Sequence, residues 1–342
     1  MSAESQQLQL WLEEIHRVLA ERIGGWLVRQ ADWAMDLDDV QKAARLARGK
    51  QVRPRILLAT HAACGGNFGP GIRDVACALE LYHGVSLIYD DIQDNARRRR
   101  GQPTYHTTQG VSAALSLCAL LSRLVNLMTL DNEALDAAAR LRLTLRFTRA
   151  QIDVSTGQMA ETVWVRDGRL DVPDEWYWRM IRGKTAALFA YAAETGADLG
   201  TGGAAAATQA FRETGERLGM LFQLVDDHAD LFLADDGKPR GHDVREAKRT
   251  LYMLHARRTL PPADRAEFDR LYLLPERNDE QVAWLLDRIR ASGAEEMGRA
   301  HVRRLAAEIH RSLDDLAERH FRDAGFGAEL RATLVSICRG LA

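Results

Sequence analysis

The chain has 342 residues, enough for one large domain or two ordinary ones, and 46% of them are apolar, a normal globular fraction that permits a large core. The formal net charge is −2, so no overall charge imbalance directs the protein to nucleic acid or to an anionic membrane surface. Ala, Leu, Arg and Glu dominate, while strand-like runs of alternating Val, Ile, Thr and aromatic residues are scarce, and this balance favours helices.

The ends and the cysteines indicate a soluble, cytoplasmic protein. Residues 1–10 are polar and lack the apolar core of a signal peptide, and we expect no apolar run to approach the ~20 residues that span a bilayer. No two cysteines form a CxxC pair, which predicts buried, reduced thiols and neither a disulfide framework nor a zinc site. The cysteines are Cys64, Cys77, Cys118 and Cys338.

Helical periodicity runs through almost the whole chain, without a linker, repeat or low-complexity segment. Short Gly, Pro and Asp signals break it into roughly ten helices, and we predict one all-α domain over residues 1–342, built as a bundle of antiparallel helices. The breaks are expected near residues 65–66, 69–71, 101–103, 168–173, 200–203, 235–241, 261–262 and 275–279.

Three aspartates end a predicted helix that runs from about Ile72 to Asp94. Asp90 and Asp94 are four residues apart and share a face with each other, while Asp91 lies between them. The rest of this helix is apolar. Carboxylates at the end of a largely buried helix repel each other, so this arrangement predicts a cation that neutralises them.

A second acidic group, Asp226, Asp227 and Asp230, lies in another apolar stretch, with Gln223 on the same polar stripe. Alone, either group would more often be an exposed acidic helix end. Two such groups facing each other would form an oxygen-only site for hard divalent cations. Magnesium fits best, because it accepts carboxylate and phosphate ligands, whereas the lack of cysteine and paired histidine ligands disfavours zinc.

Basic residues occur at several places along the chain, four of them directly after the first acidic group. Four consecutive arginines, residues 97–100, could be a solvated salt-bridge network, and at most two of them can line one pocket because consecutive side chains point in different directions. Gly183-Lys184-Thr185 resembles the end of a phosphate-binding loop, but Trp178 stands where that loop needs glycine. Together with aspartates, these cations predict a site for substrates with several phosphates.

The motifs, in this order, resemble those of the trans-type polyprenyl diphosphate synthases, the farnesyl and geranylgeranyl diphosphate synthase family. The resemblance covers about Lys50 to Leu254. Its landmarks are Gly49-Lys50-x-x-Arg53-Pro54, Glu80-Leu81-Tyr82-His83, Asp90-Asp91-x-x-Asp94, Arg99-Arg100-Gly101-x-Pro103, Gly157-Gln158, Gly183-Lys184-Thr185-x-x-Leu188-Phe189, Phe222-Gln223-x-x-Asp226-Asp227-x-x-Asp230 and Gly237-Lys238-x-x-Gly241-x-Asp243.

The resemblance implies a magnesium-dependent homodimer with a central active-site cavity, which condenses isopentenyl diphosphate with an allylic diphosphate and releases pyrophosphate. It implies that Asp90, Asp94 and Asp226 ligate Mg²⁺, supported by Asp91, Asp227 and Asp230. It also implies that Arg99, Lys184 and Lys238 hold the allylic diphosphate, that Thr185 and Gln223 lie near the reacting carbon, and that Lys50, Arg53, His83 and Arg100 bind isopentenyl diphosphate.

Four positions depart from the family pattern: Tyr89, Cys118, Glu161 and Ala247. None removes an expected metal ligand. Two alternatives remain: a terpene cyclase on the same fold, which would not need a second diphosphate pocket, and a non-catalytic subunit of a heteromeric synthase, which could lose an aspartate group without harm. Consumption of isopentenyl diphosphate distinguishes a synthase from a cyclase, and activity of the purified chain alone tests the non-catalytic alternative.

Product length can be argued from helical geometry. If the growing chain runs along the helix that ends at Asp90, one turn of ~5.4 Å accommodates about one isoprene unit. Val85 and Ser86, about one turn before Asp90, are small and should not stop growth at fifteen carbons. Tyr82, one turn further back, is bulky enough to form the floor of the cavity that holds the growing chain. Growth would then stop near twenty carbons, which predicts geranylgeranyl diphosphate; alternatively Tyr82 is an ordinary core residue.

Overall fold

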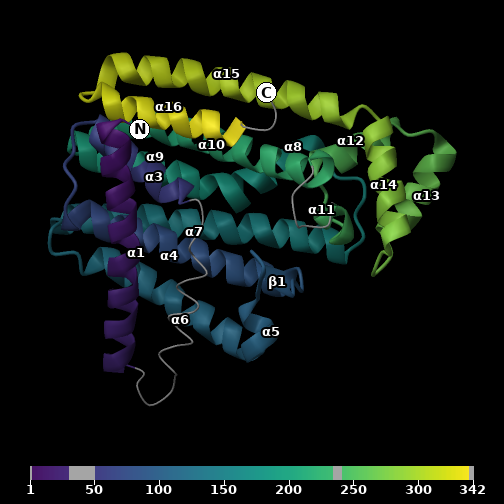
Figure 1. The fold of residues 1–342 in the computed structure, drawn as a ribbon, viewed down its shortest axis with the longest axis horizontal. Helices are drawn as coiled ribbons and strands as arrows, with labels where there is room; N and C mark the ends of the chain where they lie inside the picture. The colour runs from purple at the N-terminus through teal and green to yellow at the C-terminus, as the bar shows by residue number, and fades with distance from the viewer. Residues whose placement is uncertain (1, 31–50, 234–240, 339–342) are drawn as a thin grey trace. The chain divides into compact units, whose positions relative to one another are not determined.

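The computed structural model describes residues 2–30, 51–233 and 241–338, with only the backbone for 26–30. In these ranges the chain is almost entirely helical, which confirms the all-α prediction (Figure 1). The long helices are α1 (Ala3–Gln30), α3 (Val52–Ala63), α4 (Pro70–Gln93), α6 (Val111–Leu130), α7 (Ala137–Arg166), α9 (Ala187–Thr201), α10 (Ala205–Phe232), α14 (Asp279–Ala291), α15 (Ala294–His320) and α16 (Ala324–Cys338). The shorter ones are α5 (Tyr105–Gln109), α8 (Asp174–Ile181), the π-helix η1 (Arg182–Ala186), α11 (His242–Arg245), α12 (Leu251–Thr259) and α13 (Pro262–Tyr272).

Helix boundaries follow the glycine and proline signals in the sequence. Helix α3 ends at Ala63, before the predicted break at Gly65, and α4 begins at Pro70, where the first helical turn needs no N–H from proline. Several breaks were not predicted, among them Gly110 between α5 and α6 and Gly293 between α14 and α15. Both glycines have a φ near +80°, a conformation that other residues rarely adopt.

A two-stranded hairpin interrupts the helices directly after α4. Strand β1 (Arg98–Arg99) pairs antiparallel with β2 (Gln102–Pro103), and the two residues between them, Arg100 and Gly101, both have positive φ, at 51° and 77°. Two left-handed residues in a two-residue connection are the signature of a type I′ turn. A break was predicted at this position, but the hairpin was not.

Contacts between Cα atoms divide the chain into two compact units. The prediction of a single domain stays a prediction. Helices α7, α9, α10, α15 and α16 contribute residues to both units. Unit 1 consists of Met1–Arg149, Tyr191–Arg212 and Leu316–Leu330, and unit 2 of Ala150–Ala190, Glu213–Asp315 and Arg331–Ala342.

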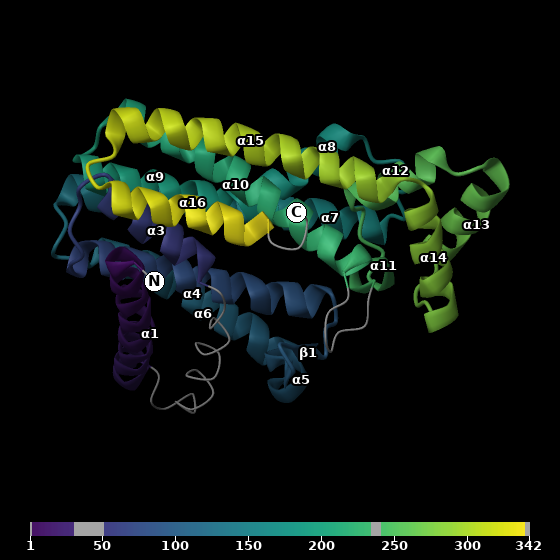
Figure 2. The same ribbon diagram turned by 45° about the horizontal axis from the view of Figure 1, so that its top comes forward.

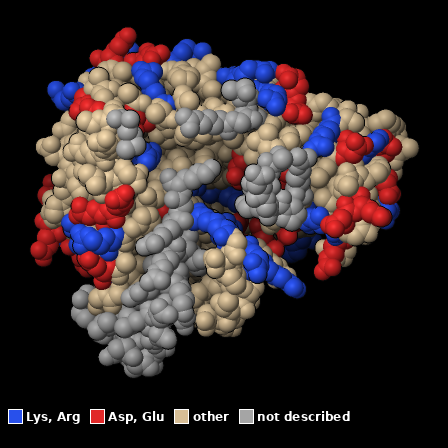
Figure 3. Space-filling view, in the orientation of Figure 1, with Lys and Arg blue, Asp and Glu red and all other residues tan. Residues whose placement is uncertain are grey.

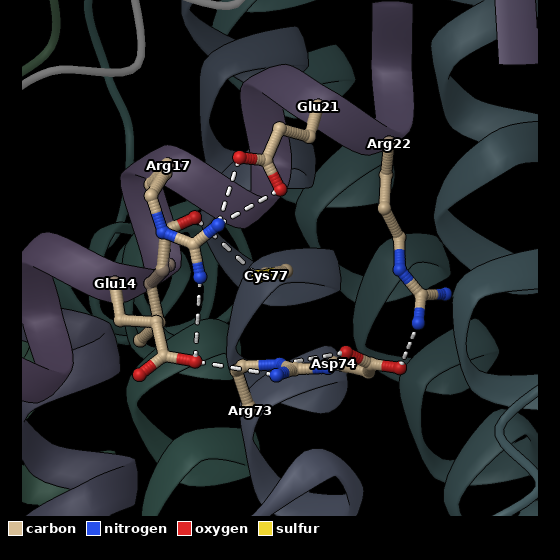
Figure 4. Close-up of polar contacts among 8 residues, drawn as sticks. Glu14, Arg17, Glu21, Arg22, Arg73, Asp74 and Cys77 are labelled. Carbon is tan, nitrogen blue, oxygen red and sulfur yellow. Dashed lines mark hydrogen bonds and ion pairs between the residues drawn. The ribbon is translucent and has the colours of Figure 1, made fainter. Parts of the chain in front are cut away.

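In unit 1, helix α4 packs against α1, α3 and α6, and α1 crosses it (Figures 1 and 2). An ion-pair cluster fixes this crossing. Asp74 of α4 is 2% exposed and accepts hydrogen bonds from Arg22 at 2.5 Å and from Arg73 at 3.2 Å, and Arg73 also reaches Glu14 of α1 (Figure 4). The helix that carries the first acidic group is therefore held at its other end by buried charge.

In unit 2, η1 places Gly183, Lys184 and Thr185 inside a helix, as predicted, but in a wide π turn. A Cβ atom on Gly183 would lie 2.6 Å from the carbonyl oxygen of Asp153, and one on Gly157 would lie 2.3 Å from the Lys184 nitrogen. The two glycines thus let the backbones of α7 and η1 approach closely. Helices α11 to α14 pack together next to this region.

Among the described residues, α6 alone is long and apolar enough, by length and composition, to cross a membrane. The prediction that no apolar run approaches this length was wrong, because α6 carries a single charged residue, Arg123, in twenty. The core helix of a soluble protein passes the same test, and α6 buries one side against α4. Elsewhere, both signs of charge are interspersed on the face shown in Figure 3.

All four cysteines are free, and Cys64, Cys77 and Cys118 are buried. Burial raises the pKa of the Cys64 thiol to about 12. The predicted burial holds for these three thiols, whereas Cys338 is half-buried; protonated, buried thiols are chemically inert.

Candidate active site

The first acidic group lies where α4 ends, and its environment differs from residue to residue. Asp91 is 2% exposed and accepts a hydrogen bond from the Arg99 Nε at 2.7 Å, while Asp90 accepts one from Nη2 of the same guanidinium at 2.9 Å. Burial raises the pKa of Asp91, and Arg99 opposes that rise. Asp94 caps the helix and is half-buried. One arginine therefore holds two of the three carboxylates in the ligand-free structure.

The type I′ turn explains how Arg99 reaches these carboxylates. Reversal of the chain at Arg100–Gly101 sends β2 back along β1, and Thr104, after β2, donates its hydroxyl to the Ala96 carbonyl at 2.7 Å. The hairpin is thus closed at its base. Arg99 is fixed toward α4, and Arg100, at the turn, is exposed.

A second group of charges surrounds His83 in unit 1. Nη1 of Arg53, from α3, lies 3.1 Å from Nε2 of His83, so two of the predicted isopentenyl diphosphate residues are in contact. Burial, and then the guanidiniums of Arg53 and Arg100, lower the pKa of His83 well below its usual value. One turn before His83, Glu80 is 1% exposed, and neither of its carboxylate oxygens has a hydrogen-bond partner among the described residues.

The second acidic group, in unit 2, contains an ordered chain of hydrogen bonds. The Tyr177 hydroxyl donates to Asp227 at 2.8 Å, the Gln223 amide donates to the other Asp227 oxygen at 2.7 Å, and the Thr185 hydroxyl donates to the Gln223 carbonyl oxygen at 2.5 Å. Because both oxygens of the buried Asp227 accept bonds from side chains, this residue orients Gln223. The geometry brings together Thr185 and Gln223, the two residues expected near the reacting carbon.

Asp230 accepts bonds from the backbone instead. The amides of His242 and Asp243 donate to its two oxygens at 3.0 Å each. Burial and the nearby Asp243 raise the pKa of Asp230 to about 7. Asp226, in contrast, is exposed. Within this group the first aspartate faces solvent, and the other two accept hydrogen bonds from the protein.

Lys184 projects from the π turn and forms an ion pair of 2.5 Å with Glu161 on α7. Both side chains are largely buried, at 17% and 9% exposure. Glu161, although it departs from the family pattern, thus places a carboxylate within reach of Lys184. The other departures are structural: Tyr89 is half-buried, Cys118 is buried with its thiol 3.9 Å from the Val85 carbonyl, and Ala247 is buried with a φ of 55°.

The residues predicted to set product length lie on α4 in unit 1. Val85 is buried, and Ser86 is half-buried with its hydroxyl bonded to the His83 carbonyl. Tyr82 makes an edge contact with Phe147, 5.7 Å between ring centroids, and Phe147 in turn stacks on Tyr191 at 4.4 Å. Tyr82 therefore belongs to a cluster of three aromatic rings.

Two predicted site residues, Lys50 and Lys238, lie outside the described residues. Within the described ranges, no group of three or more His, Cys, Asp or Glu side chains lies close enough to hold a metal ion. Sequence reasoning missed Tyr177 and Glu80 as site residues. Tyr177 gave no signal, because its contact with Asp227 joins residues fifty positions apart; Glu80 was visible as a carboxylate within an apolar helix.

Comparison with known sequences identifies the family. The polyprenyl synthetase profile matches residues 37–289. A short chain isoprenyl diphosphate synthase of Methanothermobacter thermautotrophicus is 34% identical over 286 residues, covering 81% of this chain and 84% of the relative. A geranylgeranyl diphosphate synthase of Saccharolobus solfataricus is 30% identical, covering 81% and 80%.

Solved structures agree with this family. A geranylgeranyl pyrophosphate synthase from Corynebacterium glutamicum, complexed with isoprenyl diphosphate and magnesium, is 26% identical with a TM-score of 0.80 over 95% of this chain and 98% of that one. A decaprenyl diphosphate synthase from Rhodobacter capsulatus is 24% identical with a TM-score of 0.84 over 99% and 98%, a likeness of fold.

The chain belongs to the polyprenyl synthetase family. It is a prenyltransferase of isoprenoid biosynthesis.

Proposed function

We propose that the enzyme condenses isopentenyl diphosphate with an allylic diphosphate, that it requires Mg²⁺, and that its main product is geranylgeranyl diphosphate. The observation that carries the proposal is the hydrogen-bond chain from Tyr177 through Asp227 and Gln223 to Thr185, beside the second acidic group. It is a preorganised polar site built from α8, η1 and α10, of the kind that stabilises developing charge.

Oxygen donors of the two acidic groups fit a hard divalent cation. In the proposal, Asp90, Asp94 and Asp226 ligate Mg²⁺, while Asp91, Asp227 and Asp230 orient neighbouring groups. The exposure of Asp226 and the occupied oxygens of Asp227 and Asp230 support this division. Magnesium keeps several waters and phosphate oxygens as ligands, so few protein carboxylates are needed. When bound, the metal supplies Lewis-acid stabilisation of the leaving diphosphate.

The protein's own residues bind and orient the substrates. Arg99, Lys184 and Lys238 hold the allylic diphosphate. The side-chain amide of Gln223 donates a hydrogen bond to Asp227, which orients the Gln223 carbonyl oxygen so that it presents negative partial charge to the allylic cation. Lys50, Arg53, His83 and Arg100 hold isopentenyl diphosphate, and the contact between Arg53 and His83 supports this pocket. The departing pyrophosphate accepts the proton that is lost after bond formation.

Metal dependence is tested by removing one carboxylate from each acidic group. Asp90→Ala and Asp226→Ala should lower turnover by about a hundredfold or more, because each removes a metal ligand, while thermal unfolding stays cooperative. Asp171→Ala, which removes a carboxylate that is 96% exposed, is the control. Full activity of either variant, or of the wild type in excess chelator, would contradict the metal proposal; failure to consume isopentenyl diphosphate would favour a cyclase.

The proposed product length rests on the aromatic cluster of Tyr82, Phe147 and Tyr191. Tyr82→Ala and Phe147→Ala should both shift products beyond twenty carbons, because each shortens the same floor, and Val85→Phe should shorten them. The measurement is chromatography of products from each allylic primer. Relatives named for farnesyl as well as geranylgeranyl diphosphate leave length open to this assay. An unchanged distribution in both alanine variants would mean that the floor lies elsewhere.

A homodimer is proposed from the exposed apolar residues. Twelve large hydrophobic side chains are exposed in the described chain, and eight of them lie on two helices. Such a concentration on a soluble protein marks an interaction surface. They are Val111, Leu115, Leu127 and Leu130 of α6 and Leu141, Leu145, Ile152 and Met159 of α7.

A further inference from the structure

The segment His242–Lys248, directly after the second acidic group, ends in a strained turn. The Lys248 amide donates to the Asp243 carbonyl at 2.8 Å and the Ala247 amide to the Val244 carbonyl at 3.2 Å, the two bonds of a Schellman motif that closes α11. The motif requires a left-handed residue, here Ala247 with a φ of 55°. Glycine adopts this conformation without penalty, whereas an alanine held in it lowers the stability of the fold by about 1 kcal/mol.

Arg249 binds the carbonyl side of this turn. Its side chain is 1% exposed, and its guanidinium donates to the carbonyl oxygens of Ala247, of Arg169 at 2.6 Å and of Trp164 at 3.4 Å. In the described chain these acceptors are all main-chain oxygens, and burial lowers the pKa of the guanidinium. Burying a cation in this way is costly, so we expect the planar Arg249 guanidinium to hold these backbone segments in a position that a smaller side chain would not.

A second buried arginine repeats the arrangement. Arg277 donates to the carbonyl oxygens of Arg245, at 2.9 Å, and of Tyr272, and the Tyr272 hydroxyl donates to the Lys248 carbonyl at 2.9 Å. Both guanidinium carbons lie over the Tyr272 ring, 5.6 Å from its centroid for Arg249 and 5.4 Å for Arg277. Three side chains therefore hold the carbonyls of residues 245, 247 and 248.

The opposite side of the same segment contacts the acidic group. The amides of His242 and Asp243 donate to the Asp230 carboxylate, and Asp243 pairs with Lys248 at 3.4 Å. The segment thus has two attachments: its carbonyls accept bonds from Arg249, Arg277 and Tyr272, and its amides donate to Asp230.

We infer that Arg249 is a positioning residue, which fixes His242–Lys248 against Asp230 and offsets the strain of alanine at position 247. Arg277 and Tyr272 complete the clamp. The effect of the clamp on the reaction rests on the proposed function, but the fixed segment itself does not. Lysine at position 249 would keep the charge but lose the planar fork that reaches three carbonyls, so the segment would detach locally while the fold persists.

The first test is hydrogen exchange of the full-length protein, read at the amides of residues 242–248. In Arg249→Lys these amides should exchange about tenfold faster, while those of α10 and α14 keep wild-type protection. Arg258→Lys, on the neighbouring helix α12 and 44% exposed at its side chain, is the matched control and should change nothing. Unchanged exchange at 242–248, or an equal rise throughout unit 2, would overturn the inference.

The second test uses Ala247→Gly and kinetics. Glycine removes the left-handed strain, so Ala247→Gly should restore most of the protection lost in Arg249→Lys. Arg249→Lys should lower kcat/KM for the allylic diphosphate about tenfold and leave the KM for isopentenyl diphosphate unchanged, and the double variant should recover. Absence of recovery overturns the coupling of the two residues. If the wild type condenses no substrate, the proposed function fails, and the exchange result still decides the clamp.

Discussion

At the scale of single residues, Arg53 and Lys184 distinguish the two proposed diphosphate pockets. Arg53→Ala should raise the KM for isopentenyl diphosphate about tenfold or more, because it removes the cation in contact with His83. Lys184→Ala should act mainly on the allylic KM. Steady-state kinetics with each substrate varied in turn measure both, and equal weakening of both substrates in each variant would refute the two-pocket assignment.

Controls for this experiment come from the neighbouring structure. Arg55→Ala, two residues from Arg53 on α3, removes a cation that pairs with Glu329 at 3.6 Å, and should leave both KM values unchanged. Lys184→Ala leaves the buried Glu161 without its ion pair, which is destabilising in itself. The double variant Lys184→Ala/Glu161→Gln removes that charge, and should show the same allylic defect with better stability.

Glu80 gives a prediction about pH. Burial raises its pKa from 4.5 to about 7, although Arg53 and Arg100 act in the opposite direction. Between these two pH values the folded protein holds a proton that the unfolded chain has released, so the free energy of unfolding falls as the pH rises from about 4.5 to about 7. A tenfold change in proton affinity corresponds to ~1.4 kcal/mol, so this fall is at most about 3 to 4 kcal/mol.

Glu80→Gln should therefore become more stable than the wild type as the pH rises. The difference in unfolding free energy, measured by urea denaturation without ligands, should be smallest near pH 4.5, grow through the window and level off above pH 7. A difference that does not vary with pH would show that Glu80 is ionised in the folded protein at all these values.

Residue identity in the site was partly predictable. The two acidic groups follow from the i, i+4 spacing of carboxylates in apolar helices, a local pattern. The different environments of the aspartates in the second group cannot be predicted from a local pattern, because they depend on contacts between distant residues. These contacts join Tyr177 with Asp227, and the amides of residues 242 and 243 with Asp230. Burial of Arg249 was equally invisible, since its acceptors are backbone oxygens.

At the scale of elements, the α1–α4 crossing shows how buried charge holds two helices together. Asp74→Ala should lower the free energy of unfolding by about 1 to 3 kcal/mol, because it removes a 2% exposed carboxylate and leaves Arg22 without that partner. The partial exposure of Arg22, 40% at its side chain, keeps the loss below that of a fully buried pair. Urea denaturation measures it.

Figure 4 also contains the control for this prediction. Arg17 and Glu21, on α1, form an i, i+4 pair of 2.8 Å in which both side chains are about 60% exposed. Arg17→Ala should change the unfolding free energy by less than about 0.5 kcal/mol, since exposed pairs contribute little. If Arg17→Ala costs as much as Asp74→Ala, burial is not what gives the cluster its strength.

Helix boundaries were the most predictable feature of the fold, because glycine and proline act locally. Elements that depend on departures from regular geometry were not predicted. The π turn of η1 arises where Gly157 and Gly183 permit close backbone contact, and the hairpin after α4 arises because Arg100 accepts a left-handed conformation. Neither feature changes the hydrophobic periodicity on which the sequence argument relied.

At the scale of the whole molecule, the spacing of the exposed residues supports a second copy of the chain as the partner of α6 and α7. On α7, Leu145, Ile152 and Met159 recur every seven residues, the spacing of helix–helix seams. On α6, the small residues Ser116 and Ala119 are exposed between leucines and permit close approach. Apolar faces of this kind are self-complementary and suit an isologous dimer.

Leu145→Glu should therefore convert a dimer to monomers. In the monomer this side chain is 50% exposed, so the charge costs little there, whereas in the dimer it would be buried without a partner. Leu10→Glu, at a leucine of α1 that is 64% exposed, introduces the same charge on another helix and should leave the dimer intact. Sedimentation velocity over a concentration series measures the mass of each variant. A wild-type chain that sediments as a monomer at every concentration, or a Leu145→Glu variant that stays dimeric, would show that these helices serve another purpose.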